Sequence, residues 1–471
     1  MARAKPKPKK IYFIGIKGMG MSALAVITRQ LGFEVWGSDM AETYSSEETE
    51  QRFRDLDITT YQGFEAQHLQ AVRPDKVVVS AAYGATNPEV KAAKALRVTL
   101  VTQSEMLGEV IAKQESIGVA GIHGKTTTTA MLAFVLEQAG YSPSYFIGAP
   151  DVAGLKGNGH LGDGKYFVVE ADEYRKSETD NTPKFLDLPL NHLIITSLEL
   201  DHPDIFDTAE DVYAAFYRLW TRLPRGGTAV INTDWQLTRR LVNRLADRPA
   251  LTYGLSSPAQ FQIVEVQERV NETEFQLRSG EKTLGPFTVN LPGLHNVQNA
   301  TAVIILALQL GVSLATLTKT LPKITLPKRR FQILGQVNGA TVVDDYAHHP
   351  TAIRYLIAAA RKRFPGKNIM IVFQPHTYSR TGKFLSEFAL ALAEADRVIL
   401  LNIFASAREK SGYVSIKDLI DRLREHKDQV EYRPTLSEVA TYLKSQITDK
   451  DVVLLTGAGD VYKVFAYLQN T

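Results

Sequence analysis

The sequence predicts an α/β protein of three domains, and three observations on its 471 residues support that prediction. Short apolar runs alternate with longer helix-like segments along almost the whole chain, as in α/β units with parallel sheets. Two glycine-rich turns, far apart in the sequence, each follow a candidate strand. The chain is also too long for one hydrophobic core. We expect the domains to span residues 1–112, 113–325 and 326–471.

The first expected domain starts with the apolar run IYFIGI (11–16), followed by a helix from Met19 to Leu31. Two further strands, EVWGSD (34–39) and KVVVSAA (76–82), continue the pattern. Residues 1–10 are rich in lysine and proline, which cannot bury a core, so we expect a disordered basic arm there.

The second expected domain restarts with ESIGVAGIHGKTTTTAMLAFVLEQAG (115–140), a strand, a loop and a helix that Gly140 should end. The strands KYFVVEAD (165–172) and HLIITSLE (192–199) follow. Between about 253 and 290 apolar and polar residues alternate, which predicts antiparallel hairpins at the sheet edge.

Residues 320–330 carry two prolines and no regular pattern, so we expect a linker to the third domain. Beyond it, four apolar runs each end in a polar tip: ATVVDDYAHH (340–349), NIMIVFQPH (368–376), RVILLNIF (397–404) and VVLLTGAGD (452–460). These runs predict a third α/β block.

Composition narrows the class of protein. Hydrophobic residues make up 44% and charged residues 22% of the chain, the formal net charge is +3, and there is no cysteine. Disulfides and thiolate metal sites are therefore excluded. No apolar stretch approaches the roughly 18 residues of a membrane span, and the N-terminus lacks a signal-peptide hydrophobic region. We expect a cytoplasmic protein with no membrane or nucleic-acid partner.

The clearest chemical signal is GIHGKTTTT (121–129), where a glycine turn joins a strand to a helix. Backbone N–H groups and the helix N-terminus would converge on phosphate oxygens there, Lys125 would add a cation, and a threonine hydroxyl could hold Mg²⁺. A strict Walker A motif would carry glycine where this chain has Val119. A glycine turn with an exposed lysine is the alternative interpretation.

A weaker glycine turn, GIKGMG (15–20), follows the first strand. A dinucleotide fingerprint would need glycine in place of Lys17, although Asp39 has the spacing of an acidic residue that reaches a ribose hydroxyl. We therefore expect a phosphate-binding turn rather than a nicotinamide site, with a plain tight turn as the alternative.

Acidic side chains follow two candidate strands of the second domain: Glu170 and Asp172 in VVEADE, and Asp201 beside His202 in LELDHPD. Ligands of open parallel sheets bind outside the carboxyl ends of the strands, where the 121–129 loop also lies. Oxygen ligands suit Mg²⁺ bridging nucleotide phosphates, so we expect Glu170 and His202 to be functional. Helix capping is the alternative for these acids.

The third expected domain gathers unusual side chains at two strand tips. DDYAHHPTAI (344–353) and FQPHTYSRT (373–381) bring two acids, two tyrosines, three histidines and an arginine. We expect these tips to line a site, with ordinary solvated side chains as the alternative.

These segments, in this order, resemble the Mur ligases over essentially the whole chain. The resemblance rests on GIKGMGMSALA, GIHGKTTTT, EADE, DH, LPGLHNVQNA (291–300), KRRF (328–331) and DDYAHHPT. The segments SEMLGE (104–109) and FQPHTYSRT are similar to those of the members that add L-alanine.

The resemblance implies a Rossmann-like first domain for UDP-N-acetylmuramate, a P-loop-type central ATPase domain, and a Rossmann-like third domain that closes over ATP and binds the amino acid. It implies that ATP drives the ligation of L-alanine to UDP-N-acetylmuramate through an acyl phosphate, in peptidoglycan precursor synthesis. Attack of a carboxylate on ATP must overcome like-charge repulsion, which Lys125 and Mg²⁺ would relieve.

The resemblance also implies roles for individual residues. The catalytic group would comprise Lys125, Glu170, His202 and Arg330, with Thr126, Glu170 and His202 as Mg²⁺ ligands. The ATP-binding residues would be Gly121, His123, Gly124, Lys125, Thr126, Thr127, His295, Asn296, Asn299, Arg330 and Asp345. The UDP-sugar and the amino acid would contact Gly15, Gly18, Gly20, Met21, Ser22, Asp39, Ser80, Tyr346, His348, His376 and Arg380.

Several features depart from the family pattern. Lys17 replaces a glycine, Phe64 stands where histidine is frequent, and Gln103 stands where arginine is usual. The segment from Glu170 to Asp201 is long for an L-alanine ligase and resembles the recycling ligase that joins an L-Ala-D-Glu-diaminopimelate tripeptide to the same UDP-sugar, which is our alternative. A nicotinamide oxidoreductase, a nucleotide-driven switch and a non-catalytic sugar-nucleotide-binding protein each explain fewer of the motifs.

Overall fold

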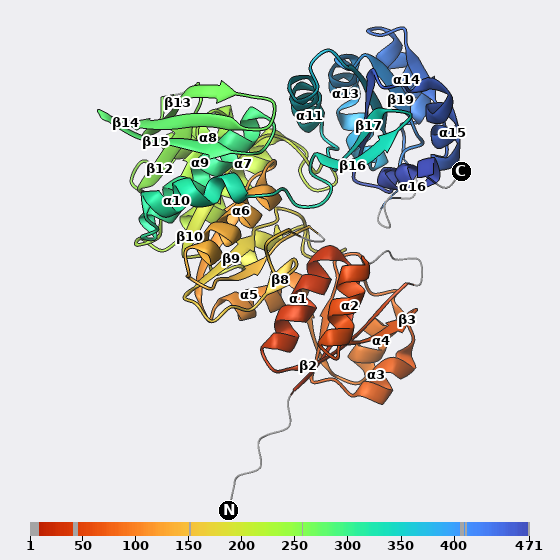
Figure 1. Cartoon of the computed structure of the whole chain (residues 1–471). Coiled ribbons are helices and arrows are strands. Elements are labelled where there is room, and N and C mark those ends of the chain that lie inside the picture. Colours follow the sequence, from red (N-terminus) through yellow and green to blue (C-terminus); the bar gives the residue numbers. More distant parts are fainter. Residues whose placement is uncertain are drawn as a thin grey trace, which may run out of the picture.

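The computed structural model describes residues 9–40, 46–149, 152–256, 258–405, 409 and 412–469. These residues form three α/β domains, each with its own sheet, that follow one another along the chain (Figure 1). The prediction of a three-domain α/β protein is confirmed. Most of the predicted basic arm, residues 1–8, lies outside the described residues.

The first domain contains a sheet of parallel strands in the order β3-β2-β1-β4-β5. Its elements are β1 (Lys10–Ile14), α1 (Met19–Gln30), β2 (Glu34–Asp39), α2 (Glu47–Asp55), β3 (Thr59–Gln62), α3 (Ala66–Val72), β4 (Lys76–Val79), α4 (Pro88–Ala95), β5 (Thr99–Thr102) and α5 (Gln103–Ile111). Alternate residues of the central strand β1 enter two cores: Tyr12 and Ile14 pack with α3 and α4, and Ile11 and Phe13 pack with α1.

Three details of this domain differ from the predictions. Lys10 belongs to β1, where its N–H donates to Asp75 (2.7 Å), so the arm ends before it. Strand β4 stops at Val79 because the Tyr83 N–H turns back to the Ser80 carbonyl (3.0 Å). The strands β3 and β5 are not predicted, because both are short edge strands without an apolar run.

The second domain is built on a sheet with the order β15-β14-β13-β12-β11-β10-β6-β9-β7-β8. Its strands are β6 (Glu115–Ala120), β7 (Ser144–Phe146), β8 (Gly159–His160), β9 (Tyr166–Glu170), β10 (His192–Ile195), β11 (Ala229–Asn232), β12 (Ala250–Gly254), β13 (Phe261–Glu268), β14 (Thr273–Ser279) and β15 (Lys282–Val289). Its helices are α6 (Lys125–Gln138), α7 (Ala209–Thr221), α8 (Gln236–Arg244), α9 (Leu294–Gln309) and α10 (Leu314–Thr320), with short 3₁₀ turns at Lys184–Asp187 and Leu321–Lys323. The antiparallel hairpins β13–β15 occupy one edge, as the alternation predicts.

The strand tips of this domain agree only in part with the predictions. Helix α6 ends before Gly140, whose φ of +81° suits a glycine stop, as predicted. Strand β9 ends at Glu170, two residues before the predicted end at Asp172, so Asp172 lies on the loop that follows. Strand β10 ends at Ile195, so Asp201 and His202 lie on the following loop rather than at the strand tip.

The third domain has the sheet order β16-β17-β21-β18-β19-β20, in which only β16 is antiparallel to its neighbour among the described strands. Its elements are β16 (Gln332–Val337), β17 (Ala340–Asp345), α11 (Pro350–Arg363), β18 (Asn368–Phe373), α12 (Tyr378–Lys383), α13 (Leu385–Ala393), β19 (Arg397–Leu400), α14 (Ile416–Arg424), β20 (Val430–Tyr432), α15 (Leu436–Gln446), β21 (Asp451–Thr456), a 3₁₀ turn (Val461–Lys463) and α16 (Val464–Gln469). The four predicted strands, β17, β21, β18 and β19, are the central ones. They are buried because a separate core covers each face of the sheet.

The predicted linker 320–330 is wrong in its first half. Leu321 and Ile324 are buried in the core of the second domain, because their apolar side chains cover the ends of β15 and α10. Between the 3₁₀ turn that ends at Lys323 and the strand β16, only residues 324–331 lie outside helices and strands.

The first two domains contact each other backbone to backbone. Helix α1 crosses β8 at Gly159, where a Cβ atom would lie 2.4 Å from the Ala23 carbonyl oxygen. The Asn158 amide also donates to the Met19 carbonyl (3.1 Å), and the Leu161 N–H donates to the Gln30 side chain (2.8 Å). Glycine at 159 therefore permits the close approach of the two domains.

Across the described part of the chain, no helix is both long and apolar enough to cross a membrane.

Candidate functional site

A cavity of about 700 Å³ lies between the three domains. Its lining includes Gly18, Gly20, Met21, Ser80, Gln103, His123, Gly124, Lys125, Thr126, Thr127, Glu170, Arg175, Lys184, His202, His295, Asn296, Asn299, Arg330, Asp345, Tyr346, His348, His376 and Arg380. Most of the residues that the sequence singles out therefore share one space. Gly15, Ser22, Asp39 and Gly121 are not among the described residues that line it.

The loop from Gly121 to Gly124, here called the glycine loop, connects β6 to α6. Gly121 has a φ of +135° and Gly124 a φ of +82°, conformations that side chains rarely adopt. A Cβ atom on Gly124 would also lie 2.5 Å from the Asn299 side chain of α9. The tight loop leaves the N-terminus of α6 facing the cavity, which is a favourable position for an anion.

Thr126 and Glu170 form a pair of oxygen donors beside this helix end. The Thr126 hydroxyl donates to Glu170 Oε1 (2.8 Å), and the Gly148 N–H donates to Glu170 Oε2 (2.7 Å). Burial raises the pKa of Glu170 above its ordinary value, although Lys125 opposes this effect. A buried carboxylate in that condition is stabilised by an added cation.

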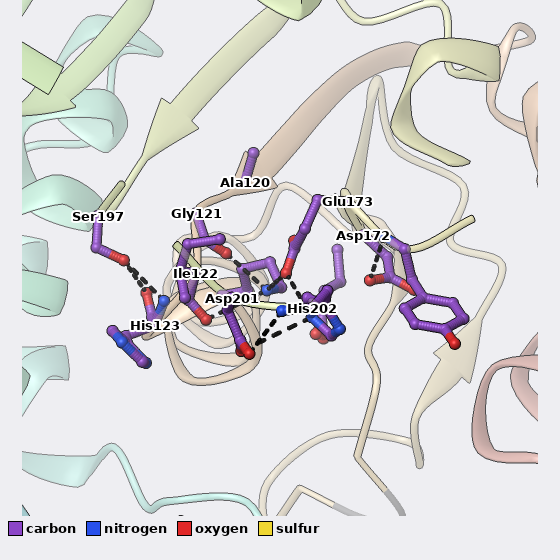
Figure 2. A network of polar contacts seen from close by, with 12 residues as sticks. Ala120, Gly121, Ile122, His123, Asp172, Glu173, Ser197, Asp201 and His202 are labelled. Carbon is purple, nitrogen blue, oxygen red and sulfur yellow. Dashed lines mark hydrogen bonds and ion pairs between the residues drawn. The ribbon is translucent and has the colours of Figure 1, made fainter. Parts of the chain in front are cut away.

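Lys125, Glu173 and His202 form a charged cluster around the fully buried Glu173 carboxylate. The Glu173 and His202 side chains are shown in Figure 2. Lys125 Nζ donates to Glu173 Oε1 (2.8 Å) and to the Gly121 carbonyl (2.6 Å). His202 Nε2 lies 3.2 Å from the same Glu173 oxygen. Burial opposes the charge on Lys125, but the carboxylates of Glu173, Asp172 and Glu170 together raise the pKa of the lysine. Glu173 thus anchors two predicted catalytic groups, although the sequence does not distinguish it from its acidic neighbours.

Asp201 and Arg380 connect the second domain to the third. Arg380 Nε donates to Asp201 Oδ1 (2.8 Å), and Arg380 Nη2 lies 3.4 Å from His202 Nδ1. Burial favours the neutral acid, yet Arg380 and His202 hold the pKa of Asp201 well below its usual range. His202 has a φ of +55°, and the hydrogen bond from its N–H to Asp201 (2.6 Å) supports this turn. Arg380, predicted to bind substrate, has a protein carboxylate as its partner here.

A second contact between these domains gathers around Glu199. Its carboxylate hydrogen-bonds the His123 ring of the glycine loop and accepts from the Thr351 hydroxyl of α11 (3.2 Å). His349 Nδ1 lies 3.6 Å from Glu199. Glu199 carries no signal in the sequence. His349 belongs to a strand tip that is predicted to line the site, but its contact with Glu199 is not predicted, because only the docking of two domains brings the two residues together.

The third domain supplies the opposite wall of the cavity. Asp345 accepts from the N–H groups of Phe331 (2.7 Å) and Ala347 (2.8 Å), and burial raises its pKa. The Arg330 guanidinium lies 5.3 Å from the centre of the Tyr346 ring.

Two buried histidines border these groups. Burial and Arg380 keep the pKa of His348 well below its usual range, and burial together with Arg330 lowers the pKa of His295 to about 4. Both rings are therefore neutral at physiological pH.

Side chains of the first domain bond to one another around its glycine turn. Asp39 accepts from the Lys17 N–H (2.8 Å) and the Tyr83 hydroxyl (3.0 Å), so its carboxylate is used inside the turn. Lys17 Nζ forms an ion pair with Glu50 (3.2 Å). A Cβ atom on Gly20 would lie 2.2 Å from the Gln103 amide nitrogen, which explains the glycine facing the cavity at this position.

The arrangement as a whole combines a helix N-terminus, Lys125 and the Thr126–Glu170 oxygen pair with polar groups of a second and third domain. Such a site suits a polyphosphate and a hard divalent cation, with room for further substrates between the domains.

Comparison with known proteins agrees with this geometry. Three family profiles match the chain in order: the Mur ligase family catalytic domain at residues 10–115, the Mur ligase middle domain at 119–307, and the Mur ligase glutamate ligase domain at 329–459. A UDP-N-acetylmuramate–L-alanine ligase from Desulfitobacterium hafniense (strain Y51) is 38% identical over 459 residues, which cover 97% of this chain and 98% of that protein.

Two solved structures are also similar. The UDP-N-acetylmuramate-alanine ligase of Thermotoga maritima has a TM-score of 0.79 and 28% identity, with 98% of each chain covered. The UDP-N-acetylmuramate:L-alanyl-gamma-D-glutamyl-meso-diaminopimelate ligase of Neisseria meningitides has a TM-score of 0.62 and 30% identity over 68% of this chain and 100% of that one. The chain, matched along nearly its whole length, belongs to the Mur ligase family.

Proposed function

We propose that this protein ligates L-alanine to UDP-N-acetylmuramate at the expense of ATP, in peptidoglycan precursor synthesis. The observation that carries the proposal is the placement of Lys125, Thr126 and Glu170 in a cavity that all three domains line. The full-length similarity to relatives named UDP-N-acetylmuramate–L-alanine ligase supports the choice of substrates. We also propose domain bounds at 112 and 325, which is consistent with the end of α5 at Ile111 and the start of β6 at Glu115.

In the proposed reaction, a carboxylate oxygen of the UDP-sugar attacks the γ-phosphorus of ATP and ADP leaves. The amine of L-alanine then attacks the carbonyl carbon of the acyl phosphate, phosphate leaves, and the nitrogen loses a proton. Both reactants of the first step are anionic, so the site must supply positive charge. Lys125, kept protonated by Glu173, is suited to contact the β- and γ-phosphates at the N-terminus of α6.

The residues present fit a magnesium ion. The Thr126 hydroxyl and the Glu170 carboxylate are hard oxygen ligands 2.8 Å apart, and the raised pKa of Glu170 indicates a need for nearby positive charge. We propose Thr126, Glu170 and His202 as the residues that hold it. When bound, the ion would neutralise charge on the transferred phosphoryl group.

The adenine and ribose of ATP would lie beyond the glycine loop, beside His295, Asn296 and Asn299 of α9. Arg330 and Asp345 would approach from the third domain, and Tyr346, His348, His376 and Arg380 would surround the amino acid. The neutral state of His348 agrees with this role, since the pocket would then add no second cation beside the incoming amine.

The recycling ligase remains the second candidate, and two observations favour it. The long segment between Glu170 and Asp201 resembles that enzyme, and a recycling ligase from Neisseria meningitides is 30% identical over 68% of this chain. A nicotinamide oxidoreductase has no comparable support, because Asp39, the expected ribose contact, is engaged by Lys17 and Tyr83.

The experiment that separates these activities is phosphate release from Mg-ATP with UDP-N-acetylmuramate and either amine. We expect turnover with L-alanine and little with the L-Ala-D-Glu-diaminopimelate tripeptide. Turnover with the tripeptide alone would assign the recycling reaction. Phosphate release that needs neither the UDP-sugar nor an amine would refute both ligase assignments.

A further inference from the structure

The basic residues around the cavity differ in how their charge is balanced. Three of them have buried or half-buried carboxylate partners: Lys125 with Glu173 (2.8 Å), Lys184 with Asp172 (3.0 Å) and Arg380 with Asp201 (2.8 Å). Arg175 also lines the cavity but has no carboxylate within ion-pair distance in the part of the chain that the structure describes. Its Nε is buried and has no hydrogen-bond partner.

Arg175 belongs to the second domain, on a segment that contacts the first domain. It follows β9 on a segment that is fastened to α5, where the Ser104 hydroxyl donates to Asp187 (2.6 Å). Lys176 strengthens the same attachment through Asp187 (3.0 Å) and Glu105 (3.1 Å). The segment that carries Arg175 is thus attached to the first domain through α5.

Contacts hold both the backbone and the side chain of Arg175. Its backbone bridges to Pro183, and its guanidinium lies 5.9 Å from the centre of the Tyr174 ring. The Tyr174 hydroxyl donates to Asp204 (2.6 Å), and the ring packs edge-on against His202 (5.2 Å). The guanidinium is therefore held near the charged cluster without taking part in it.

A buried guanidinium N–H without an acceptor is costly, and the planar fork of arginine matches carboxylate and phosphate oxygens. The missing acceptor is therefore expected from a ligand. ATP already meets Lys125 and the helix N-terminus at the glycine loop, and the amino acid would lie at the third domain. UDP-N-acetylmuramate has oxyanions in its diphosphate and in its lactyl carboxylate, and it must extend between the first and second domains.

We propose that Arg175 binds an oxyanion of the UDP-sugar and so positions that substrate between the glycine turn and the glycine loop. This inference rests on the proposed function. Gln103 lines the same cavity where the family resemblance leads us to expect arginine, so Arg175 supplies, from the second domain, a cation that the first domain lacks here.

The test is calorimetric titration of UDP-N-acetylmuramate, UDP-N-acetylglucosamine and UDP into the full-length protein and its Arg175→Gln variant. We expect the variant to bind UDP-N-acetylmuramate about 10- to 100-fold more weakly, the loss typical of a hydrogen bond to a charged group. A loss confined to UDP-N-acetylmuramate would identify the lactyl carboxylate, which the other two ligands lack. An equal loss for all three would identify the diphosphate.

Two further variants keep the result interpretable. Arg225→Gln removes an exposed arginine of the same domain and should leave all three affinities unchanged. Arg175→Lys keeps the charge but not the fork, so an intermediate loss is expected; it also serves if the glutamine variant fails to fold.

Unchanged affinity for UDP-N-acetylmuramate in both Arg175 variants would overturn the inference, as would a change limited to the KM of ATP or L-alanine. Failure of the unaltered protein to bind UDP-N-acetylmuramate would instead overturn the proposed function, and the inference with it.

Discussion

The ion pair between Arg380 and Asp201 should govern how firmly the third domain docks onto the second. Both side chains are almost completely buried, with 6% and 4% of their surface exposed, and they meet at 2.8 Å. Replacing Arg380 by methionine keeps most of the side-chain volume but leaves a charged carboxylate buried between the domains. Removing one partner of a buried ion pair costs about 3–5 kcal/mol.

This cost falls on the docked state alone, because separation of the domains returns Asp201 to water. The ratio of docked to separated molecules should therefore fall by about two to four orders of magnitude in Arg380→Met. Asp201→Asn should have a similar effect, because it leaves the guanidinium unpaired. The double variant buries no charge and should dock better than either single variant, which is the signature of a direct pair.

Small-angle scattering of the four proteins, without and with an ATP analogue, measures this balance directly. We expect a larger radius of gyration in each single variant and a partial return to the original value in the double variant. Single variants that scatter like the unaltered protein would refute the reasoning. A double variant that opens as far as the sum of the two single changes would show that the residues act independently.

Three further predictions concern the site and the third domain. Lys125→Ala should reduce phosphate release more than about 100-fold while the circular dichroism spectrum stays that of a folded protein, and near-normal release would remove the ATP-loop assignment. Chelation of divalent cations should abolish phosphate release, and Glu170→Gln should need about tenfold more Mg²⁺ for recovery; equal Mg²⁺ titrations would contradict the role of Glu170. Burial raises the pKa of Asp344 to about 6, so its deprotonation costs stability as the pH rises from about 4 to 6. Relative to Asp344→Asn, the native third domain should lose about 2–3 kcal/mol across that window in urea unfolding, and a pH-independent difference would contradict this.

The sequence predicts the side of the sheet on which the site lies because parallel strands present their carboxyl ends together. Glu170 at the end of β9, Tyr346 after β17 and His376 after β18 each follow an apolar run, and all three line the same cavity. The glycine loop is predictable for the same reason, since its neighbours in the chain are a buried strand and an apolar helix.

The contacts that depend on side-chain direction or on domain docking are not predictable in this way. In the run EADE, spacing alone does not show that Glu173 meets Lys125 while Glu170 meets Thr126. Glu199 and His349 belong to different domains and meet only in the folded chain.

Local patterns also fail where elements are short or packed by distant residues. The edge strand β5 has only four residues and no apolar run. Residues 321–324 read as a linker, because the core that buries Leu321 comes from distant parts of the second domain.

The close contact of α1 with β8 sets the distance between the binding loops of the first two domains. With Gly159 against the backbone of Ala23, the spacing between the glycine turn at the start of α1 and the glycine loop at the start of α6 cannot adjust to the length of a ligand. A nucleotide sugar whose diphosphate is held at the glycine turn must present its carboxylate at a fixed distance from the glycine loop. Discrimination then depends on molecular length as well as on charge: an analogue a few bonds too short binds at the first domain but leaves its reactive end short of ATP.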